Sequence, residues 1–322
     1  MLSRTADHLF WMARYMERAE NTARMLDVNY QTSLLPQSAT AAERGWRGLL
    51  GISELTDDFN RRHGNVNARA VMDYMVCDES NTSSIVSCLR AARENARAVR
   101  GSLTTEVWET QNQTWLEFGK LLKGQDFQKD PSTLFEWVKF RSHLSRGVTV
   151  GTMLQDEALH FLRLGTFLER ADNTARLLDV KFHARADEYF GSTQSAAAES
   201  AEVDFYHWSA VLRSVSGFEI YRKVYRNVIR PDRVAELLIL RGDMPRSLAA
   251  CMNELITNLR LVGNDESHET LRRAGRLRAD LQFARIDEIL ATGLHAFLTQ
   301  FLERVGMLGV GISHDFLVPF EA

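Results

Sequence analysis

The chain has 322 residues, of which 45% are hydrophobic and 25% are charged, as expected for a globular protein with a large core. Its formal net charge of −3 argues against nucleic-acid binding, and it has no polybasic block that would favour docking on a membrane. No apolar run approaches the roughly 20 residues that span a bilayer, and no signal peptide is recognisable. Three widely spaced cysteines, Cys77, Cys88 and Cys251, favour a reducing, cytoplasmic location.

Helical periodicity runs through most of the chain, and no convincing strand pattern interrupts it, so the sequence predicts an all-α fold. In the first half we expect loops at 57–66 and 124–131 and helices over 5–30, 38–57, 66–78, 82–100, 104–123 and 132–150. In the second half we expect a linker at 191–202 and helices over 160–180, 203–215, 218–228, 232–241, 246–262, 267–291 and 293–309. Pro131 and Pro231 suit the first turn of a helix.

Residues 8–28 and 160–180 are two copies of one helical sequence, separated by a constant offset of 152 residues. Eleven of the 21 aligned positions are identical, whereas chance would give about one. In both copies the apolar residues recur at alternating spacings of three and four, which is typical of a long helix packed against other helices. Small residues in the middle of each copy, at 19, 23, 171 and 175, would let another helix approach closely.

A weaker similarity indicates that more than one helix is duplicated. Ser84–Leu89 resembles Ser247–Met252, each at the start of a predicted helix, with an offset of 163 residues. The sequence therefore predicts a helical bundle of two tandem, pseudo-symmetric halves. The expected halves are 1–150 and 151–322, folded as one compact unit.

The repeated helix carries polar residues that are identical in both copies. At 100° per residue, one polar stripe lies beside the apolar seam and a second polar edge lies further round the helix. Other positions differ between the copies, among them Trp11/Arg163 and Arg14/Thr166, as expected for exposed side chains without partners. The fixed residues are expected to have fixed partners, and they are the candidate site: Glu17, Arg18, Asn21 and Arg24 in the first copy, and Glu169, Arg170, Asn173 and Arg176 in the second.

Three interpretations of this fixed set remain open from the sequence. The two helices could form a buried charged network, with Glu17 meeting Arg170 and Glu169 meeting Arg18. Alternatively, a polar pocket between the helices could bind an anionic or peptide-like ligand through its arginines. The third interpretation is a solvated polar face.

Two further patterns bear on function. Arg93 and Arg97 lie one turn apart on a predicted helix, either on a solvated, salt-bridged face or at the rim of a functional groove. Glu157 and His160 have the spacing of a di-iron helix, but the matching first-half position is Thr5, so we expect no metal. The common catalytic and cofactor-binding motifs are also absent, and we expect no cofactor.

The opening segment Leu2–Asp27 resembles the bacterial alpha-E family, an all-helical group named for its Glu-Arg (ER) motif. Glu17-Arg18 and Glu169-Arg170 match that motif in both copies, and Ser84–Arg97 resembles the second conserved block of the family. The resemblance covers nearly the whole chain. It departs in the second half, where Met252–Leu255 replaces the arginine-rich run, so a groove that used this run would be asymmetric.

The resemblance implies a functional context rather than a reaction. Alpha-E proteins are encoded beside, or fused to, circularly permuted ATP-grasp proteins, and ATP-grasp enzymes typically join a carboxylate to an amine through an acyl phosphate. The partner implied is therefore a circularly permuted ATP-grasp protein, together with a peptide substrate. We expect an auxiliary or binding subunit of an ATP-grasp-linked amide or peptide ligation system, which presents a Glu/Arg-lined helical surface.

Two alternatives come from the residues themselves. The chain could be an enzyme that acts on a peptide-like or anionic substrate, with Glu17 or Glu169 as acid or base. It could also be a purely structural helical scaffold.

Overall fold

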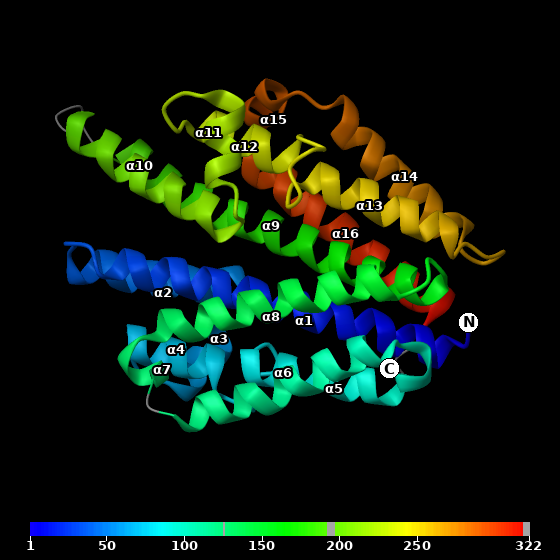
Figure 1. Cartoon of the computed structure of the whole chain (residues 1–322). Coiled ribbons are helices and arrows are strands. Elements are labelled where there is room, and N and C mark those ends of the chain that lie inside the picture. The colour runs from blue at the N-terminus through cyan, green and yellow to red at the C-terminus, as the bar shows by residue number, and fades with distance from the viewer. Residues whose placement is uncertain (125, 192–196, 318–322) are drawn as a thin grey trace.

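The computed structural model describes residues 1–124, 126–191 and 197–317, and all its regular elements in these ranges are helices (Figure 1). The all-α prediction is confirmed. The two repeat copies lie within the two longest helices, α1 (Ser3–Ser33) and α9 (Glu157–Gly191). These two helices pack against each other at the centre of the molecule. In Figure 1, helices α3 to α7 lie on one side of this pair and α10 to α15 lie on the other.

The remaining helices follow in chain order, and Pro131 and Pro231 begin α8 and α12 as predicted. Between α1 and α9 the chain forms α2 (Ala39–Ile52), α3 (Thr56–Arg62), α4 (Ala68–Val76), α5 (Ile85–Ala98), a 3₁₀ turn (Arg100–Ser102), α6 (Thr105–Lys123), α7 (Asp126–Lys129) and α8 (Pro131–Thr152). After α9 it forms α10 (Ala197–Ser214), α11 (Phe218–Tyr225), α12 (Pro231–Ile239), α13 (Leu248–Leu261), α14 (His268–Phe283), α15 (Ile286–Thr292) and α16 (Leu294–Phe316).

Several predicted boundaries were wrong, and local backbone geometry explains two of them. The helix expected over 38–57 breaks near Glu54, whose left-handed φ of 55° is incompatible with a continuing helix. The chain then resumes as α3, within the expected loop 57–66. The helix expected over 267–291 divides at Ala284, which is extended. One helical turn, α7, occupies the expected loop 124–131. In the expected linker 191–202, α10 begins at Ala197, and 192–196 lie outside the described residues.

Small side chains allow close packing around α1 and α9. The four alanines expected to permit close approach, Ala19, Ala23, Ala171 and Ala175, are completely buried. The tightest position is Gly165 in α9, where an added Cβ atom would overlap the backbone carbonyl oxygen of Phe10. The two helix backbones therefore meet directly at this point, and only glycine fits.

Matching contacts tie each long helix to its neighbour. In α1 the His8 ring lies 2.7 Å from the amide oxygen of Asn95 in α5, and in α9 the His160 ring lies 2.9 Å from Asn258 in α13. The two neighbouring helices also begin alike, because the hydroxyls of Ser84 and Ser247 accept hydrogen bonds from backbone amides in the first turn. These contacts fix α5 on α1 and α13 on α9.

Candidate functional site

The fixed Glu-Arg residues form two reciprocal ion pairs between α1 and α9. Arg170 donates to both carboxylate oxygens of Glu17, through Nε at 2.9 Å and Nη2 at 2.8 Å. Arg18 donates in the same two-point manner to Glu169, at 2.6 and 3.1 Å. Both glutamates are buried, with 1% of Glu17 and 6% of Glu169 exposed. The predicted pairing of Glu17 with Arg170 and of Glu169 with Arg18 is therefore confirmed.

The Glu17 pair belongs to a larger buried network. Arg246 donates to Glu17 at 2.9 Å and to Glu20 at 2.5 Å. Arg146 also donates to both carboxylates, and Arg24 donates to Glu20 at 2.8 Å. Two carboxylates thus face four guanidinium groups, those of Arg24, Arg146, Arg170 and Arg246. We call these six residues the charge network.

The fixed asparagine of α1 joins the charge network at its edge. The Asn21 amide oxygen accepts a hydrogen bond of 2.8 Å from Arg246. Its Nδ2 group is buried and has no hydrogen-bond partner among the described residues. Asn21 therefore orients Arg246 and leaves one buried donor unused.

The arginines keep the glutamates ionised. Burial by itself would raise the pKa of Glu17, but Arg170 and Arg246 outweigh burial and hold it below its ordinary value. The pKa of Glu20 is held well below its ordinary value in the same way, chiefly by Arg246 and Arg146 against burial. For Glu169, Arg14 and Arg18 outweigh burial and lower the pKa to about 2. Carboxylates of this kind are poor proton donors or acceptors near neutral pH.

A cavity of about 320 Å³ adjoins the charge network, between α1, α8 and α9. Its polar wall includes Glu17, Arg146, Arg163 and Arg170. We call it the arginine cavity. Arg163 pairs with Glu254 at 2.5 Å through Nη2, while its buried Nε has no hydrogen-bond partner among the described residues. Apolar side chains complete the wall, notably Met12, Met16, Leu162 and Phe167.

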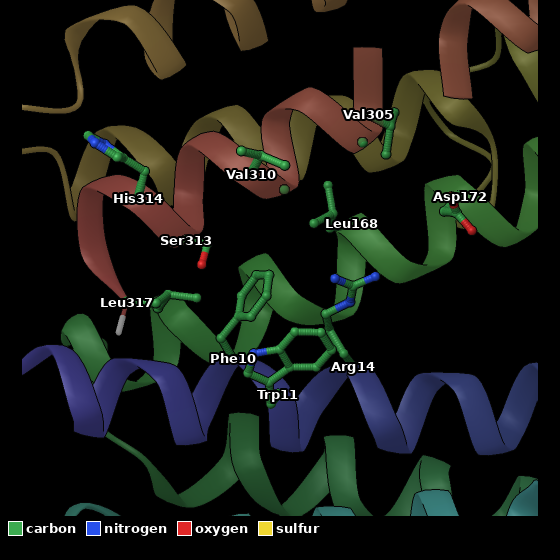
Figure 2. Close-up of a pocket in the computed structure, with 12 residues that line it drawn as sticks. Phe10, Trp11, Arg14, Leu168, Asp172, Val305, Val310, Ser313, His314 and Leu317 are labelled. Atoms are coloured by element: carbon green, nitrogen blue, oxygen red, sulfur yellow. The ribbon is translucent and has the colours of Figure 1, made fainter. Parts of the chain in front are cut away.

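A second cavity, of about 470 Å³, lies between α1, α9 and α16 (Figure 2). Phe10, Trp11 and Arg14 line it from α1, and Leu168 and Asp172 line it from α9. The α16 wall contains Gly306, Gly309 and Val310 among others. We call it the aromatic cavity. Figure 2 shows the rings of Phe10 and Trp11 rising from α1 toward α16.

Two of the positions that differ between the repeat copies line different cavities. Trp11 lines the aromatic cavity, and its counterpart Arg163 lines the arginine cavity. Likewise, Arg14 lines the aromatic cavity, and its counterpart Thr166 lines the arginine cavity. The expectation that these side chains are exposed and unpartnered was wrong, because Arg14 donates to Glu169 at 2.8 Å and is only 19% exposed.

The other fixed residues have local partners. Arg24 reaches Glu20 on its own helix and Ser216 beyond it. Its counterpart Arg176 pairs with Asp172, at 2.7 Å, and with Glu54. Among the described residues, the half-buried Asn173 makes only a long, weak contact, to the sulfur of Met25 at 4.0 Å.

The arginine-rich helix α5 forms a salt-bridged face. Arg93 and Arg97 both contact Glu94, and Arg93 also donates to Asn112 at 3.1 Å. Arg97 is 66% exposed, and neither arginine lines either cavity described above.

Reasoning from the repeat missed Glu20, Arg146 and Arg246. Glu20 had a usable signal, because an acid stands four residues before the fixed arginine in both copies, as Glu20 and as Asp172. A test of strict identity overlooks this exchange of one acid for another. Arg146 lies outside the repeated segments. Arg246 aligns with Ser83 at the offset of 163, so comparing the copies gives no signal for it.

Metal-binding clusters and membrane-spanning helices are both absent from the described residues. No group of three or more His, Cys, Asp or Glu side chains is placed to hold a metal ion there. Within the same ranges, none of the helices has the length and apolar character needed to cross a bilayer.

Comparison with known proteins places the chain in a family. Residues 1–317 match the Alpha-E family, described as a predicted alpha-helical domain with a conserved ER motif. The chain belongs to the Alpha-E family. Both Glu-Arg dipeptides of this Alpha-E chain, Glu17-Arg18 and Glu169-Arg170, lie at the contact between α1 and α9.

Similar proteins occur in mycobacteria. Uncharacterized proteins of Mycobacterium bovis and Mycobacterium tuberculosis are 24% identical to this Alpha-E chain over 327 residues. The matches cover 93% of the chain but 35% of each relative, so the chain spans about a third of their length. No solved structure matches significantly.

Proposed function

We propose that this Alpha-E chain is a binding subunit of an ATP-grasp-linked amide or peptide ligation system, and that its arginine cavity holds the carboxylate end of a peptide substrate. The observation that carries this proposal is the excess of guanidinium groups over carboxylates beside the cavity. The ATP-grasp partner rests on what the family resemblance implies.

The charge excess supports an anionic ligand. Buried charges are costly unless opposite charges compensate them, and two guanidinium charges of the network have no matching carboxylate within it. The His143 ring lies next to this excess positive charge. Nη2 of Arg24 is 3.0 Å from its Nε2 atom, and Nη2 of Arg146 is 2.7 Å from its Nδ1 atom. Partial burial is the main cause that lowers the pKa of His143; Glu20 opposes this, and the neighbouring arginines lower the pKa further. A ligand carboxylate would supply the missing negative charge.

The unused donor of Arg163 supports the same ligand. Arg163 lines the cavity, and its Nε is covered and has no hydrogen-bond partner among the described residues. A rotation of this side chain would let Nε donate to a carboxylate oxygen of the ligand, as arginine does in other anion sites. The apolar part of the wall suits the side chain next to that carboxylate. A cavity of about 320 Å³ is at the small end of ligand sites, which agrees with one terminal residue rather than a long peptide.

The enzyme alternative has less support. A general acid or base needs a pKa near the working pH, whereas the surrounding arginines hold both Glu17 and Glu169 ionised. The scaffold alternative accounts for the reciprocal ion pairs, but it leaves the charge excess and the arginine cavity unexplained.

We also propose that 1–150 and 151–322 are two copies of one helical unit, related by a pseudo-twofold axis. The reciprocal pairs and the matching His8–Asn95 and His160–Asn258 contacts support this arrangement. The greater length of the mycobacterial relatives leaves room for a fused partner in those proteins.

Calorimetric titration with N-acetyl-Ala-Leu and its C-terminal amide tests the ligand. We expect the free carboxylate to bind at least about tenfold more tightly, as for a charge-assisted hydrogen bond. Arg163→Ala should remove this preference, and the control Arg272→Ala, at an exposed arginine paired with Glu269, should retain it. Equal affinity for the acid and the amide would contradict the carboxylate site.

A separate experiment tests the partner. The chain should associate at micromolar concentration with the circularly permuted ATP-grasp protein encoded beside it, as measured by co-purification and light scattering. Absence of a complex would exclude the subunit role while leaving the carboxylate result unaffected.

A further inference from the structure

We infer that the aromatic cavity is a second, separate binding site, which takes a neutral planar aromatic group carrying a hydrogen-bond acceptor. This inference does not depend on the proposed function, because it concerns different walls on a different side of α1. On the helical wheel, the side chains lining the two cavities point about 135° apart, since successive residues are about 100° apart.

The walls of the aromatic cavity suit a flat ring. Phe10 and Trp11 meet edge to face, with ring centroids 5.9 Å apart and an interplanar angle of 87°. The Arg14 guanidinium lies 4.8 Å from the centroid of Trp11. Figure 2 shows these three side chains together on the α1 wall. Phe10 is 1% exposed and supports the ring of Trp11, which is the aromatic surface that a ligand can reach. Aromatic rings attract further rings by stacking and edge-to-face contacts, so this wall favours an aromatic ligand over an aliphatic one.

The facing wall leaves room because α16 contributes glycines there. Gly306 and Gly309 both line the cavity, and a Cβ atom added to Gly306 would meet nothing within 4 Å. The ligand would therefore lie between the α1 rings and the backbone of α16. At about 470 Å³ the cavity falls within the usual range for small-molecule sites, and it can hold an aromatic side chain with its adjoining amides.

The charges at the cavity are already compensated, which favours a neutral ligand. Arg14 donates from Nε to Glu169 at 2.8 Å. Both carboxylate oxygens of Asp172 accept from Arg176, at 2.7 and 3.1 Å. In the part of the chain that the structure describes, the two Nη groups of Arg14 have no hydrogen-bond partner, so they can donate to an acceptor on the ligand. An indole or phenyl group next to a carbonyl has this chemistry.

Binding of N-acetyl-L-tryptophanamide, measured by saturation-transfer NMR and titration against the whole chain, tests the site. We expect this probe to bind at least about tenfold more tightly than N-acetyl-L-leucinamide, the aliphatic comparison. Gly306→Leu should abolish that binding by filling the cavity. The matched control Gly119→Leu, on α6, should not change it, because an added Cβ atom there also meets open space.

A second variant, Trp11→Leu, tests whether Gly306→Leu acts by filling the cavity or by disturbing the fold. Trp11→Leu keeps an apolar side chain but removes the ring, and we expect it to weaken binding of N-acetyl-L-tryptophanamide at least about fivefold. Equal binding of the two probes, or unchanged binding in both Gly306→Leu and Trp11→Leu, would overturn the inference. Binding of N-acetyl-Ala-Leu should survive Gly306→Leu, which separates this site from the arginine cavity.

Discussion

The two copies of the repeated helix share the residues that pair them with each other, and they differ at two positions that line different cavities. Glu17 and Glu169 are identical and buried, and each holds an arginine of the other copy. Trp11 and Arg163 occupy equivalent positions, yet one lines an aromatic cavity and the other a cationic one. The identical residues therefore mark the ion-paired contact, and two of them, Glu17 and Arg170, also line the arginine cavity. The differing residues Trp11 and Arg163 give the two cavities their different chemistry.

Energetics explains why the two regions differ. A buried carboxylate that loses its arginine is left uncompensated, so neither member of the pair can change alone. A residue on a cavity wall has space in front of it, and its replacement need not leave a buried charge unpaired. The two cavities can thus differ in chemistry while the contact between α1 and α9 remains constant.

The largest expected effect is on the packing contact. Glu17→Gln should destabilise the fold by about 3–5 kcal/mol, because Arg170 and Arg246 would lose their shared buried carboxylate. Chemical denaturation measures this loss. The exposed Glu303 provides the control, since Glu303→Gln should change stability by less than about 0.5 kcal/mol. A loss below about 1 kcal/mol for Glu17→Gln would mean that the network is not structural.

Low pH should remove the stability that the ion pair between Arg18 and Glu169 contributes. The pKa of Glu169 is about 2 in the folded chain and 4.5 ordinarily, so its contribution is complete above pH 4.5 and is lost as pH falls toward 2. The shift corresponds to about 3 kcal/mol. Denaturation at several pH values in this window should show a steeper fall for the parent chain than for Glu169→Gln. Identical slopes would show that the pair does not lower the pKa.

The smallest expected effect is on a cavity wall. Arg163→Ala should change the free energy of unfolding by less than about 1 kcal/mol, because its pair with Glu254 is over one-third exposed on both sides. The same denaturation assay measures it. If Arg163→Ala lowered the free energy of unfolding as much as Glu17→Gln does, residues of the cavity walls would be as important for stability as residues of the packing contact.

Much of the central contact could be predicted from the sequence. The three-four spacing located the long helices, and the identical residues identified which glutamate meets which arginine. These features depend on periodicity and on reciprocal partners, both of which a duplicated sequence displays. Ser84 and Ser247 were also recognisable at the starts of their helices.

The cavities could not be predicted in this way. They arise where three helices meet, and one wall of the aromatic cavity exists because Gly306 and Gly309 lack side chains. Arg246 reaches the charge network from just before α13, at a position whose counterpart is Ser83. Such positions are set by how the helices pack together, and the pattern of residues along one helix carries no information about that packing.

The reciprocal ion pair also bears on ancestry. A polypeptide with a single copy of the repeated helix would bury a glutamate and an arginine without partners, unless a second molecule of the same kind supplied them across a twofold axis. Fusion of two such genes would turn that intermolecular contact into an internal one. From then on, each copy could evolve its own ligand chemistry while the old dimer interface persisted as the core of a single chain.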